Sequence, residues 1–367
     1  MKFKQIKEGK VKFFVPVGRK YDLPVFFNDE AELTRDISIS ALQVFIDNSD
    51  KKINVCDALS ASGARGLRYA AEVKGVGKVF LNDSSPSAVK LIKKNIFLNK
   101  LQKKCTAIKS DASLLLSGNI YGMIDLDPFG PPVKFLDSTA KAAFHKGFIG
   151  ITATDTAALC GSSPMAGLRK YGIKSIRTEF YNELGLRILI TSIMLAFARH
   201  EKAFIPVLAF PYKHYYRIFG KVEHEGSVAN LLDQFGFVNY CEKCSERSFG
   251  QPEIIHDGHQ MKTCGPIYLG KINDSTFVEA TLKDMRKRDF RLRKEELKLL
   301  DTLRQESDYL FYYNTHRLAK IYKFTVPKFE DLIERLNKNG FKASRTVFCD
   351  TGLRTNATLK ELLKILI

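Results

Sequence analysis

The fold is decided by the stretch Ile53-Asn-Val-Cys-Asp-Ala-Leu-Ser-Ala-Ser-Gly-Ala-Arg-Gly66. Its first five residues form a largely apolar run that ends in an acidic residue, which predicts a buried strand over 53–57. A turn of Ala, Ser and Gly follows, and the pattern then predicts a helix over 65–73. The segment therefore begins an alternation of strands and helices.

The alternation continues on the C-terminal side of this stretch. A second helix is predicted over 86–98, with a proline at its first position, where proline is well tolerated. Further strands are predicted over 78–82, 105–109, 121–125 and 147–153. Strands that alternate with helices at this spacing predict an α/β fold with a Rossmann-like, doubly wound parallel sheet.

Two domains are expected from the rest of the chain. A long helix is predicted over 176–200, followed by a strand pair at 203–210 and 215–222. From about residue 273 the pattern becomes mostly helical, with helices expected near 291–305, 328–339 and 357–366. We predict a first domain over 1–272, which includes an N-terminal extension over 1–50, and a smaller, mostly helical α+β domain over 273–367.

The charge balance indicates a polyanionic partner. The 367 residues are 45% hydrophobic and 27% charged, which excludes a disordered tail, a collagen-like fibre and a small disulfide scaffold. The net charge is +18, and a protein this basic usually binds nucleic acid, with a membrane surface as the rival. In the segment 286–294, six of nine residues are basic. This segment is either a source of phosphate contacts or a solvated helix face.

Neither membrane insertion nor secretion is expected. The longest apolar stretch, 188–198, is shorter than the ~20 residues that cross a bilayer. The first residues lack the apolar core of a signal peptide. The seven cysteines are odd in number and scattered, which predicts reduced thiols and a cytoplasmic location. No feature indicates an obligate protein partner, so we expect a monomer.

Acidic residues follow three successive strands of the predicted sheet. Ligands of such sheets bind at the carboxyl ends of the strands, and Asp57, Asp83 and Asp111 lie there. Each could be an ordinary loop residue or helix cap, but together they suit an adenosine, with its ribose at Asp83 and its adenine amino group at Asp111. The turn lacks G-x-G-x-x-G, which favours S-adenosylmethionine over a dinucleotide. The predicted cofactor-binding residues are Asp57, Ser60, Ser62, Gly63, Arg65, Asp83, Asp111 and Ala112.

The sharpest chemical motif is Asp127-Pro-Phe-Gly130, at the end of the strand predicted over 121–125. A carboxylate and a backbone carbonyl that accept the two N–H bonds of an exocyclic amino group raise the electron density on its nitrogen and aim the lone pair at a methyl sulfonium. The carboxylate can also take up the departing proton, and Phe129 offers a face for a flipped base. The alternative is a plain turn with Pro128 at its second position. We predict Asp127, Pro128 and Phe129 to be catalytic.

Several motifs, in order along nearly the whole chain, resemble those of the tRNA guanine-26 N2-dimethyltransferase family. Two of them are the loop 57–66 and the motif Asp127-Pro-Phe-Gly130. The others are Glu8-Gly-Lys10, Val25-Phe-Phe-Asn28 with Arg35-Asp36, Thr152-Ala-Thr-Asp-Thr-Ala-Ala-Leu-Cys-Gly161, Gly265-Pro-Ile-Tyr-Leu-Gly270, Ala343-Ser-Arg-Thr346 and Thr351-Gly-Leu-Arg-Thr-Asn-Ala357.

The resemblance implies a class I methyltransferase that moves one or two methyl groups from S-adenosylmethionine to N2 of guanosine 26 in tRNA. By analogy, Asp127 orients and deprotonates the amine, and Phe129 is a stacking wall. Phe26 or Phe27 would close the base pocket, and Arg35 would contact the methyl donor near its carboxylate. The helical C-terminal domain would hold the tRNA.

Two positions near this site need separate mention. Asn28-Asp29 stands where the family commonly has Asn-Pro, a departure that bears on the turn leading to the aromatic wall. Asp155 falls at the end of the strand predicted over 147–153 and faces the same edge as Asp127. It is predicted either to bind substrate or to make structural hydrogen bonds.

A metal site is predicted between residues 241 and 264. Cys241-x-x-Cys244 is followed, after eleven residues, by His256-x-x-His259, and two such pairs fit a tetrahedral structural zinc in a ribbon-like insert. Cys264 could replace one histidine. The alternative is a set of loop residues that never meet. A bound zinc would staple the loop and would do no chemistry.

Two other functions share parts of this pattern. An amino-group DNA methyltransferase would use the same Asp-Pro-aromatic logic, but the family motifs outside the catalytic core argue against it. A non-catalytic RNA-binding protein on the same fold is disfavoured by Asp127 together with an apparently complete donor site.

Overall fold

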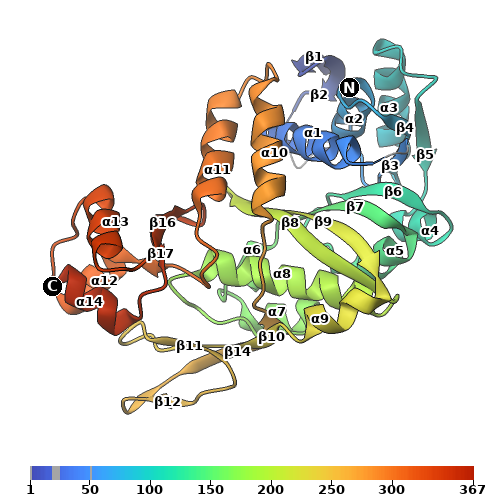
Figure 1. Ribbon diagram of the computed structural model, residues 1–367. Coiled ribbons are helices and arrows are strands. Elements are labelled where there is room, and N and C mark those ends of the chain that lie inside the picture. The colour runs from blue at the N-terminus through green and yellow to red at the C-terminus, as the bar shows by residue number, and fades with distance from the viewer. Residues whose placement is uncertain (1, 19–24, 50–51) are drawn as a thin grey trace.

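A seven-stranded sheet lies at the centre of the computed structural model, which describes residues 2–18, 25–49 and 52–367 (Figure 1). The strand order is β5-β4-β3-β6-β7-β9-β8. The first five strands in this order are parallel, whereas β9 is antiparallel to both β7 and β8. Their bounds are β3 (Ile53–Asp57), β4 (Val76–Asp83), β5 (Cys105–Lys109), β6 (Tyr121–Leu126), β7 (Ala143–Ala153), β8 (Lys202–Tyr212) and β9 (Tyr215–His224). The predicted doubly wound sheet is confirmed, with an antiparallel strand pair at one edge.

Helices cover both faces of this sheet. One apolar core contains side chains of α1 (Glu32–Asp47), α2 (Ala64–Glu72) and α3 (Pro86–Leu98). The other contains side chains of α4 (Ala112–Ser117), α5 (Val133–Ala142) and α8 (Tyr181–Ala198). A strand in a sheet that is buried on both faces needs apolar side chains on both of its sides. The strands of this sheet therefore appear in the sequence as near-continuous apolar runs and not as alternating apolar and polar residues.

Helix α8 is shorter than the helix predicted over 176–200. It begins at Tyr181, because residues 174–178 form an irregular segment before it, in which Ile176 packs into the core. α8 is long and apolar enough to cross a membrane, but most of it is buried inside the protein. Its apolar side chains fill the core beneath the sheet rather than facing outwards.

The C-terminal quarter of the chain contributes to two different cores. The helix pair α10 (Ser275–Arg286) and α11 (Arg293–Gln305) stands beside α1 and shares its core (Figure 1). Residues 313–366 form a core of their own. It is built from β15 (Tyr313–Asn314), α12 (Thr315–Tyr322), α13 (Phe329–Lys338), β16 (Ala343–Thr346), β17 (Cys349–Thr355) and α14 (Leu359–Leu366). The three predicted helices are confirmed within two residues, and the boundary near 272 stays a prediction.

Smaller elements surround these cores. At the N-terminus, β1 (Phe3–Glu8) pairs with β2 (Val11–Pro16), and the 3-10 turn Asp29–Ala31 precedes α1. Residues 1, 19–24 and 50 of the predicted extension lie outside the described residues. Between β7 and α8 lie α6 (Thr156–Leu159) and α7 (Pro164–Tyr171). After α9 (Val228–Leu232), a second sheet forms from β10 (Phe235–Tyr240), β11 (Arg247–Gly250) and β14 (Lys262–Tyr268), with the hairpin β12 (Ile255–His256) and β13 (His259–Gln260) beside it.

Candidate active site

The predicted site residues gather at one edge of the central sheet. Strands β3, β4, β5 and β6 are parallel, so their carboxyl ends meet at the same edge. Asp57 ends β3 and Asp83 ends β4, while Asp111 and Asp127 follow β5 and β6 directly. The order of the strands therefore places all four carboxylates along one line, as the sequence predicts.

The loop after β3 is folded tightly against the end of β4. Ala61 has a positive φ of 48° and donates its backbone N–H to Oδ2 of Asp83 at 3.0 Å. The other oxygen of Asp83 accepts from the N–H of Ser85 at 2.8 Å. Gly63 also has a positive φ, 82°, and a Cβ there would lie 3.1 Å from Leu81. Glycine thus lets the loop enter α2 close to the sheet, and Asp83 holds the loop in place.

Asp57 and Asp111, the other acids at the sheet edge where the methyl donor is predicted to bind, differ in exposure. Asp57 is buried and accepts from the N–H of Gly66 at 2.9 Å. Burial and the neighbouring Asp125 carboxylate raise the pKa of Asp57 to about 7. Asp111 is exposed and caps α4 by accepting from the N–H groups of Ser113 and Leu114. Their predicted contacts with an adenosine stay predictions.

Three other predicted donor-site residues are buried, Ser60 and Ser62 in the loop after β3 and Ala112 at the start of α4. Ser60 donates its hydroxyl to the carbonyl of Asp57 at 2.8 Å, which closes the turn. Ser62 is buried. Ala112 is buried at the first turn of α4. These contacts make the loop rigid, which favours the close approach of a ligand to its backbone.

The catalytic motif forms an exposed loop between β6 and α5. The side chain of Asp127 is 30% exposed, and Phe129 is 65% exposed although it is a large apolar residue. Gly130 donates its N–H to Oγ1 of Thr154 at 2.7 Å and accepts from the N–H of Thr154 at 3.2 Å. The loop is therefore tied to the end of β7, while buried Pro128 anchors it from below.

Of the two candidate aromatic walls, Phe26 faces the catalytic motif. Its ring lies 4.1 Å from that of Phe129, edge to face at 66°. Phe27 instead packs on Phe13, and the Arg35 guanidinium lies over it at 5.1 Å. The two rings are in direct contact, so Phe26 braces Phe129, whose exposed ring offers a face on which a planar base can stack.

The turn that carries these rings is fixed by Asn28 and Arg35. Asn28 accepts from the N–H of Glu30 at 3.3 Å and so caps the 3-10 turn without the proline that the family commonly has. Arg35 donates to the carbonyl of Asn28 at 3.0 Å and is paired with Glu8 through two hydrogen bonds of 2.5 and 2.8 Å. Its predicted contact with the methyl donor stays a prediction.

A buried ion-pair network, which the sequence analysis did not find, supports Asp127 from behind. Arg65 donates to Oδ2 of Asp127 at 2.5 Å, and its Nε lies 3.5 Å from Asp125. Asp125 in turn is held by both terminal nitrogens of Arg217 and by the hydroxyl of Tyr69. Ser38 on α1 accepts from both arginines, at 2.8 and 3.2 Å. The network joins α1, α2, β6 and β9 beneath one carboxylate.

The electrostatics of this network favour charged partners. Burial alone would raise the pKa of Asp125, but the charges of Arg217 and Arg65 hold it below the usual value. A Cβ at Gly150 would lie 2.6 Å from a terminal nitrogen of Arg217, so glycine makes room for the pair. No spacing in the sequence reveals this arrangement, because Arg217 lies 92 residues from Asp125 in an ordinary-looking strand. The only sequence signal was the Asp-x-Asp spacing of Asp125 and Asp127.

Asp155 lies next to the catalytic loop but is engaged in local contacts. It accepts from the Tyr171 hydroxyl at 2.6 Å and from the Lys170 ammonium at 3.1 Å. These bonds tie the start of α6 to the end of α7. Two roles are predicted for Asp155. The structure shows its structural hydrogen bonds, and its binding of substrate stays a prediction.

Three of the predicted metal ligands meet in space. The ligand atoms of Cys241, Cys244 and His259 all lie within 4.8 Å of one another, with Cys241 Sγ 3.6 Å from His259 Nδ1. His256 pairs with His259 across the β12–β13 hairpin, but its imidazole lies 3.4 Å from the exposed Asp257 carboxylate. Cys264 is buried in the core. Two thiols and one imidazole at these distances fit three positions of a tetrahedral zinc.

Comparisons with known proteins agree with one another along the whole chain. Residues 5–367 match the family described as N2,N2-dimethylguanosine tRNA methyltransferase. The tRNA (guanine(26)-N(2))-dimethyltransferase of Methanobrevibacter smithii is 35% identical, over 100% of this chain and 97% of its own length. The enzyme of the same name from Pyrococcus horikoshii is 34% identical, over 96% and 95%. The structure of Trm1 from Pyrococcus horikoshii with S-adenosyl-L-methionine superposes with a TM-score of 0.90, at 32% identity and 99% coverage of both chains.

Proposed function

Because this chain belongs to the N2,N2-dimethylguanosine tRNA methyltransferase family, we propose that Asp127 orients and deprotonates the amine that it methylates. The reaction is the transfer of one or two methyl groups from S-adenosylmethionine to N2 of guanosine 26 in tRNA. The observation that carries the proposal is the exposed ring of Phe129, which Phe26 holds by an edge-to-face contact two residues from the partly exposed Asp127 at the end of β6. Asp127 lies next to the loop after β3, which Asp83 at the end of β4 holds in place.

In this mechanism the protein positions an amine that is a poor nucleophile. The guanine stacks on the exposed ring of Phe129, which Phe26 braces edge to face, and one N–H of its amino group donates to the second oxygen of Asp127. A backbone carbonyl of the Asp127–Gly130 loop would accept the second N–H. Both bonds return electron density to the nitrogen, and its lone pair then points at the electrophilic methyl group that S-adenosylmethionine supplies.

The proton balance follows from the same geometry. The nitrogen lone pair forms the N–C bond while the C–S bond breaks and leaves its electron pair on sulfur. The nitrogen then loses one proton, and Asp127 accepts it directly or through water. Arg65 fixes the other oxygen of this carboxylate, so Arg65 acts as a positioning residue. A monomethylated amine still carries one N–H for Asp127, so the same residues serve a second transfer.

We place tRNA phosphates on the turn between α10 and α11. Its residues Arg286, Lys287 and Lys294 are exposed, and Arg291 pairs with Glu32 at the start of α1 at 2.5 Å. Because α1 also carries part of the active site, this basic turn lies on the rim of the site. Exposed lysines and arginines attract RNA through its phosphates.

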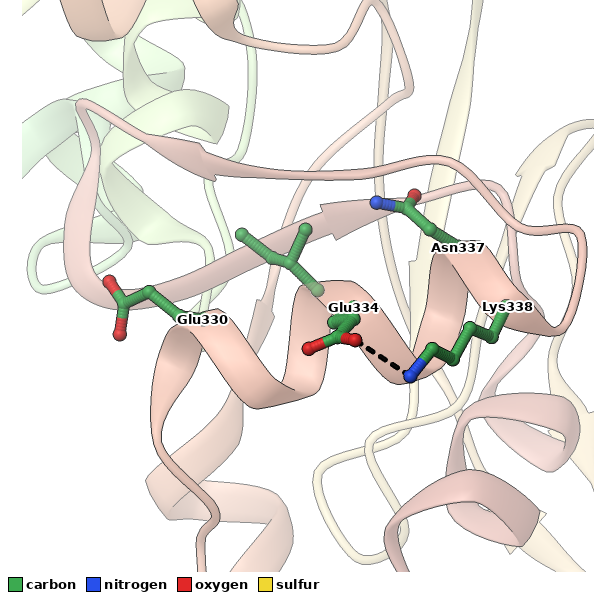
Figure 2. A pocket seen from close by; sticks show the side chains of 5 residues that line it. Glu330, Glu334, Asn337 and Lys338 are labelled. Carbon is green, nitrogen blue, oxygen red and sulfur yellow. Dashed lines mark ion pairs between the residues drawn. The ribbon is translucent and has the colours of Figure 1, made fainter.

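The α13 face of the C-terminal core is a poor candidate for phosphate contacts. Figure 2 shows a hollow of about 530 Å³ there, lined by Glu330, Ile333, Glu334, Asn337 and Lys338. Its one lysine is paired with Glu334 at 2.7 Å. Glu330 is likewise paired with Arg345 at 2.5 Å, so no lining residue offers phosphate an unpaired cation. If this core contacts tRNA, as predicted, it does so through another face.

The cluster of Cys241, Cys244 and His259 would hold a structural zinc. The two thiolates and the imidazole would supply three ligands, and His256, on the same hairpin, would have to turn from Asp257 to supply the fourth. α12 reinforces the cluster, because Tyr322 donates to the carbonyl of Cys244 at 2.9 Å and Arg317 to that of Glu242 at 2.6 Å. A zinc there would hold the second sheet against the C-terminal core.

The cellular setting follows from the substrate and the thiols. The seven cysteines are all free, which suits a reducing cytoplasm. We expect a monomer, which light scattering of the purified protein would test.

The function is tested by incubating purified protein with unmodified tRNA transcripts and labelled S-adenosylmethionine. Nucleoside digestion should yield N2-methyl- and N2,N2-dimethylguanosine, and both should disappear when guanosine 26 is replaced by adenosine. Label in DNA, or no label in any tRNA despite measurable donor binding, would contradict the proposal.

A further inference from the structure

A second hollow lies beside the Asp127–Gly130 loop, and its lining does not include Phe129, on which the target base would stack. It has a volume of about 380 Å³, within the usual range for small-molecule sites of roughly 300–1,000 Å³. Its lining comes from α6, from the turn that follows it and from the segment that leads into α8. The lining residues are Thr156, Ala157, Cys160, Ser162, Arg177, Thr178 and Tyr181.

The position of this hollow connects it to the catalytic loop on one side. Thr154, which exchanges two hydrogen bonds with Gly130, lies two residues before the first lining residue, Thr156. On the other side, Asn182 at the start of α8 donates to the carbonyl of Phe348 at 3.0 Å. The hollow therefore lies between the Asp127 loop and the C-terminal core.

The chemistry of the lining is that of a nucleotide site. The side chain of Tyr181 is 45% exposed, which leaves its ring free for stacking, and Arg177 is exposed. The hydroxyl oxygen of Thr178 is buried and has no hydrogen-bond partner among the described residues. Ser162 presents an exposed hydroxyl. An aromatic face, one guanidinium and two hydroxyls match a base, a phosphate and a ribose.

The charge of the lining separates this hollow from the one beside α13. The described residues that line it include one cation and no acidic residue. The α13 hollow in Figure 2 instead carries two carboxylates. A phosphate therefore meets a cation in the first, whereas in the second the one lining cation is already paired with Glu334.

We propose that this hollow binds the nucleotide that directly flanks the target guanosine in the tRNA chain. The flanking base stacks on Tyr181, its phosphate pairs with Arg177, and Thr178 with Ser162 hydrogen-bonds the ribose or the base edge. The inference rests on the proposed function, because it assigns a neighbour of the base that Asp127 receives.

The physical need for such a site comes from base extrusion. A target base turned out of its stack leaves a neighbour that has lost a stacking partner, which costs a few kcal/mol. An aromatic ring that takes the neighbour's face offsets this loss, and a cation on the adjoining phosphate holds the backbone in the turned-out geometry. The site would therefore stabilise the RNA conformation that brings the amine to Asp127.

The experiment combines protein variants with abasic RNA. Tyr181→Leu should raise the KM for tRNA by about tenfold, because stacking on an aromatic residue is typically worth 1–3 kcal/mol per base. Tyr181→Phe should keep the wild-type KM for tRNA, because the aromatic ring is retained. A tRNA that lacks the base on the 5′ or the 3′ side of guanosine 26 should show the same rise with wild-type protein at one of these positions. With Tyr181→Leu, that abasic RNA should show no further rise.

Arg177→Gln tests the phosphate contact. It should lower the salt dependence of tRNA binding by roughly one phosphate contact, whereas the matched variant Lys338→Gln beside α13 should leave it unchanged. Affinity for S-adenosylmethionine should stay at the wild-type value in all variants, which also checks folding.

The outcomes separate this inference from the proposed function. If wild-type protein fails to methylate guanosine 26, the proposed function is wrong. If it methylates normally but Tyr181→Leu keeps a KM within twofold of wild type, the flanking-nucleotide site is wrong. Additive losses for Tyr181→Leu and both abasic RNAs would also overturn it.

Discussion

Asp127 is useful to the reaction only if its carboxylate is held in one orientation. Arg65 fixes one of its oxygens, and Arg65 is itself fixed by Ser38 and by the buried pair of Asp125 and Arg217. A positioned carboxylate of this kind contributes through geometry, since small displacements of a reacting group reduce rates strongly.

Asp127→Ala should lower kcat by roughly 10²–10⁴-fold, because it removes both the orienting acceptor and the base. Binding of S-adenosylmethionine and of tRNA should change little, as measured by calorimetry and filter binding. The side chain is partly exposed, so the variant should fold. Near wild-type turnover in this variant would show that another group accepts the amine.

Tyr69→Phe tests whether the buried network acts through Asp127. It removes one hydroxyl that donates to Asp125 and leaves the ring in the core. We expect roughly a tenfold fall in kcat with an unchanged KM for tRNA, which corresponds to about 1.4 kcal/mol in the transition state. Tyr268→Phe, which removes a hydroxyl bonded to the carbonyl of Lys271 in the second sheet, is the control.

A double-variant cycle completes this test. In the Asp127→Ala background, Tyr69→Phe should have no further effect on residual turnover if it acts by positioning Asp127. Two independent losses would mean that Tyr69 only stabilises the fold.

Asp57 gives a pH prediction for stability. Its folded pKa of about 7 lies above the ordinary value of 3.8, so the folded protein binds a proton that the unfolded chain has lost between these values. The free energy of unfolding should therefore fall as pH rises from about 4 to about 7, by at most roughly 4 kcal/mol. Asp57→Asn should flatten this dependence in urea titrations at several pH values. An unchanged slope in the variant would mean that other groups cause it.

The positions of Asp127 and of the acids Asp57, Asp83 and Asp111 at one sheet edge could be predicted from the sequence because they end or closely follow strands. Asp125 and Arg217 could not be recognised, since their meaning depends on strand β9 lying beside β7 in antiparallel order. The sequence also could not show which of Phe26 and Phe27 faces the site. Adjacent residues in an irregular turn carry no period that tells which one faces the site.

At the scale of elements, the second sheet and α12 act as one unit around the cysteine cluster. Removal of zinc, or Cys244→Ser, should lower Tm by roughly 5 °C or more and should loosen α12, because Tyr322 binds the backbone at Cys244. Elemental analysis should find about one zinc per chain in the wild type. Cys349→Ser, a free cysteine outside the cluster, should change neither metal content nor Tm. A zinc-free protein of unchanged stability would contradict the zinc proposal.

Most elements of the central sheet could be predicted because apolar runs bounded by turns are a local signal. The start of α8 was placed five residues too early, since apolar residues such as Ile176 pack in the core without being helical. The surface on which α10 and α11 pack also could not be predicted from the sequence. Their sequence shows an amphipathic pair but cannot say that the apolar stripe packs on α1 rather than on the C-terminal core.

At the scale of the whole molecule, the net charge of +18 matters where it is exposed near the site. Replacing Lys287 and Lys294 by Gln should weaken tRNA binding and reduce the slope of log affinity against log salt by roughly 1 to 2. Lys338→Gln carries the same chemical change on the α13 face and should have no effect, because that lysine is already neutralised by Glu334. Equal effects of both changes would mean that RNA binding follows total charge and not this turn.

The packing of α10 and α11 on α1 also sets the order in which this protein can mature on the ribosome. Ser38 on α1 holds Arg65 behind Asp127, yet the face of α1 opposite the sheet is covered by residues 275–305. Until those residues have left the ribosome, α1 has an apolar face open to water, and a nascent chain in that state is prone to aggregate. The site, whose residues and support run from Phe26 to Arg217, is therefore protected on the α1 side only after residues 275–305 have been made.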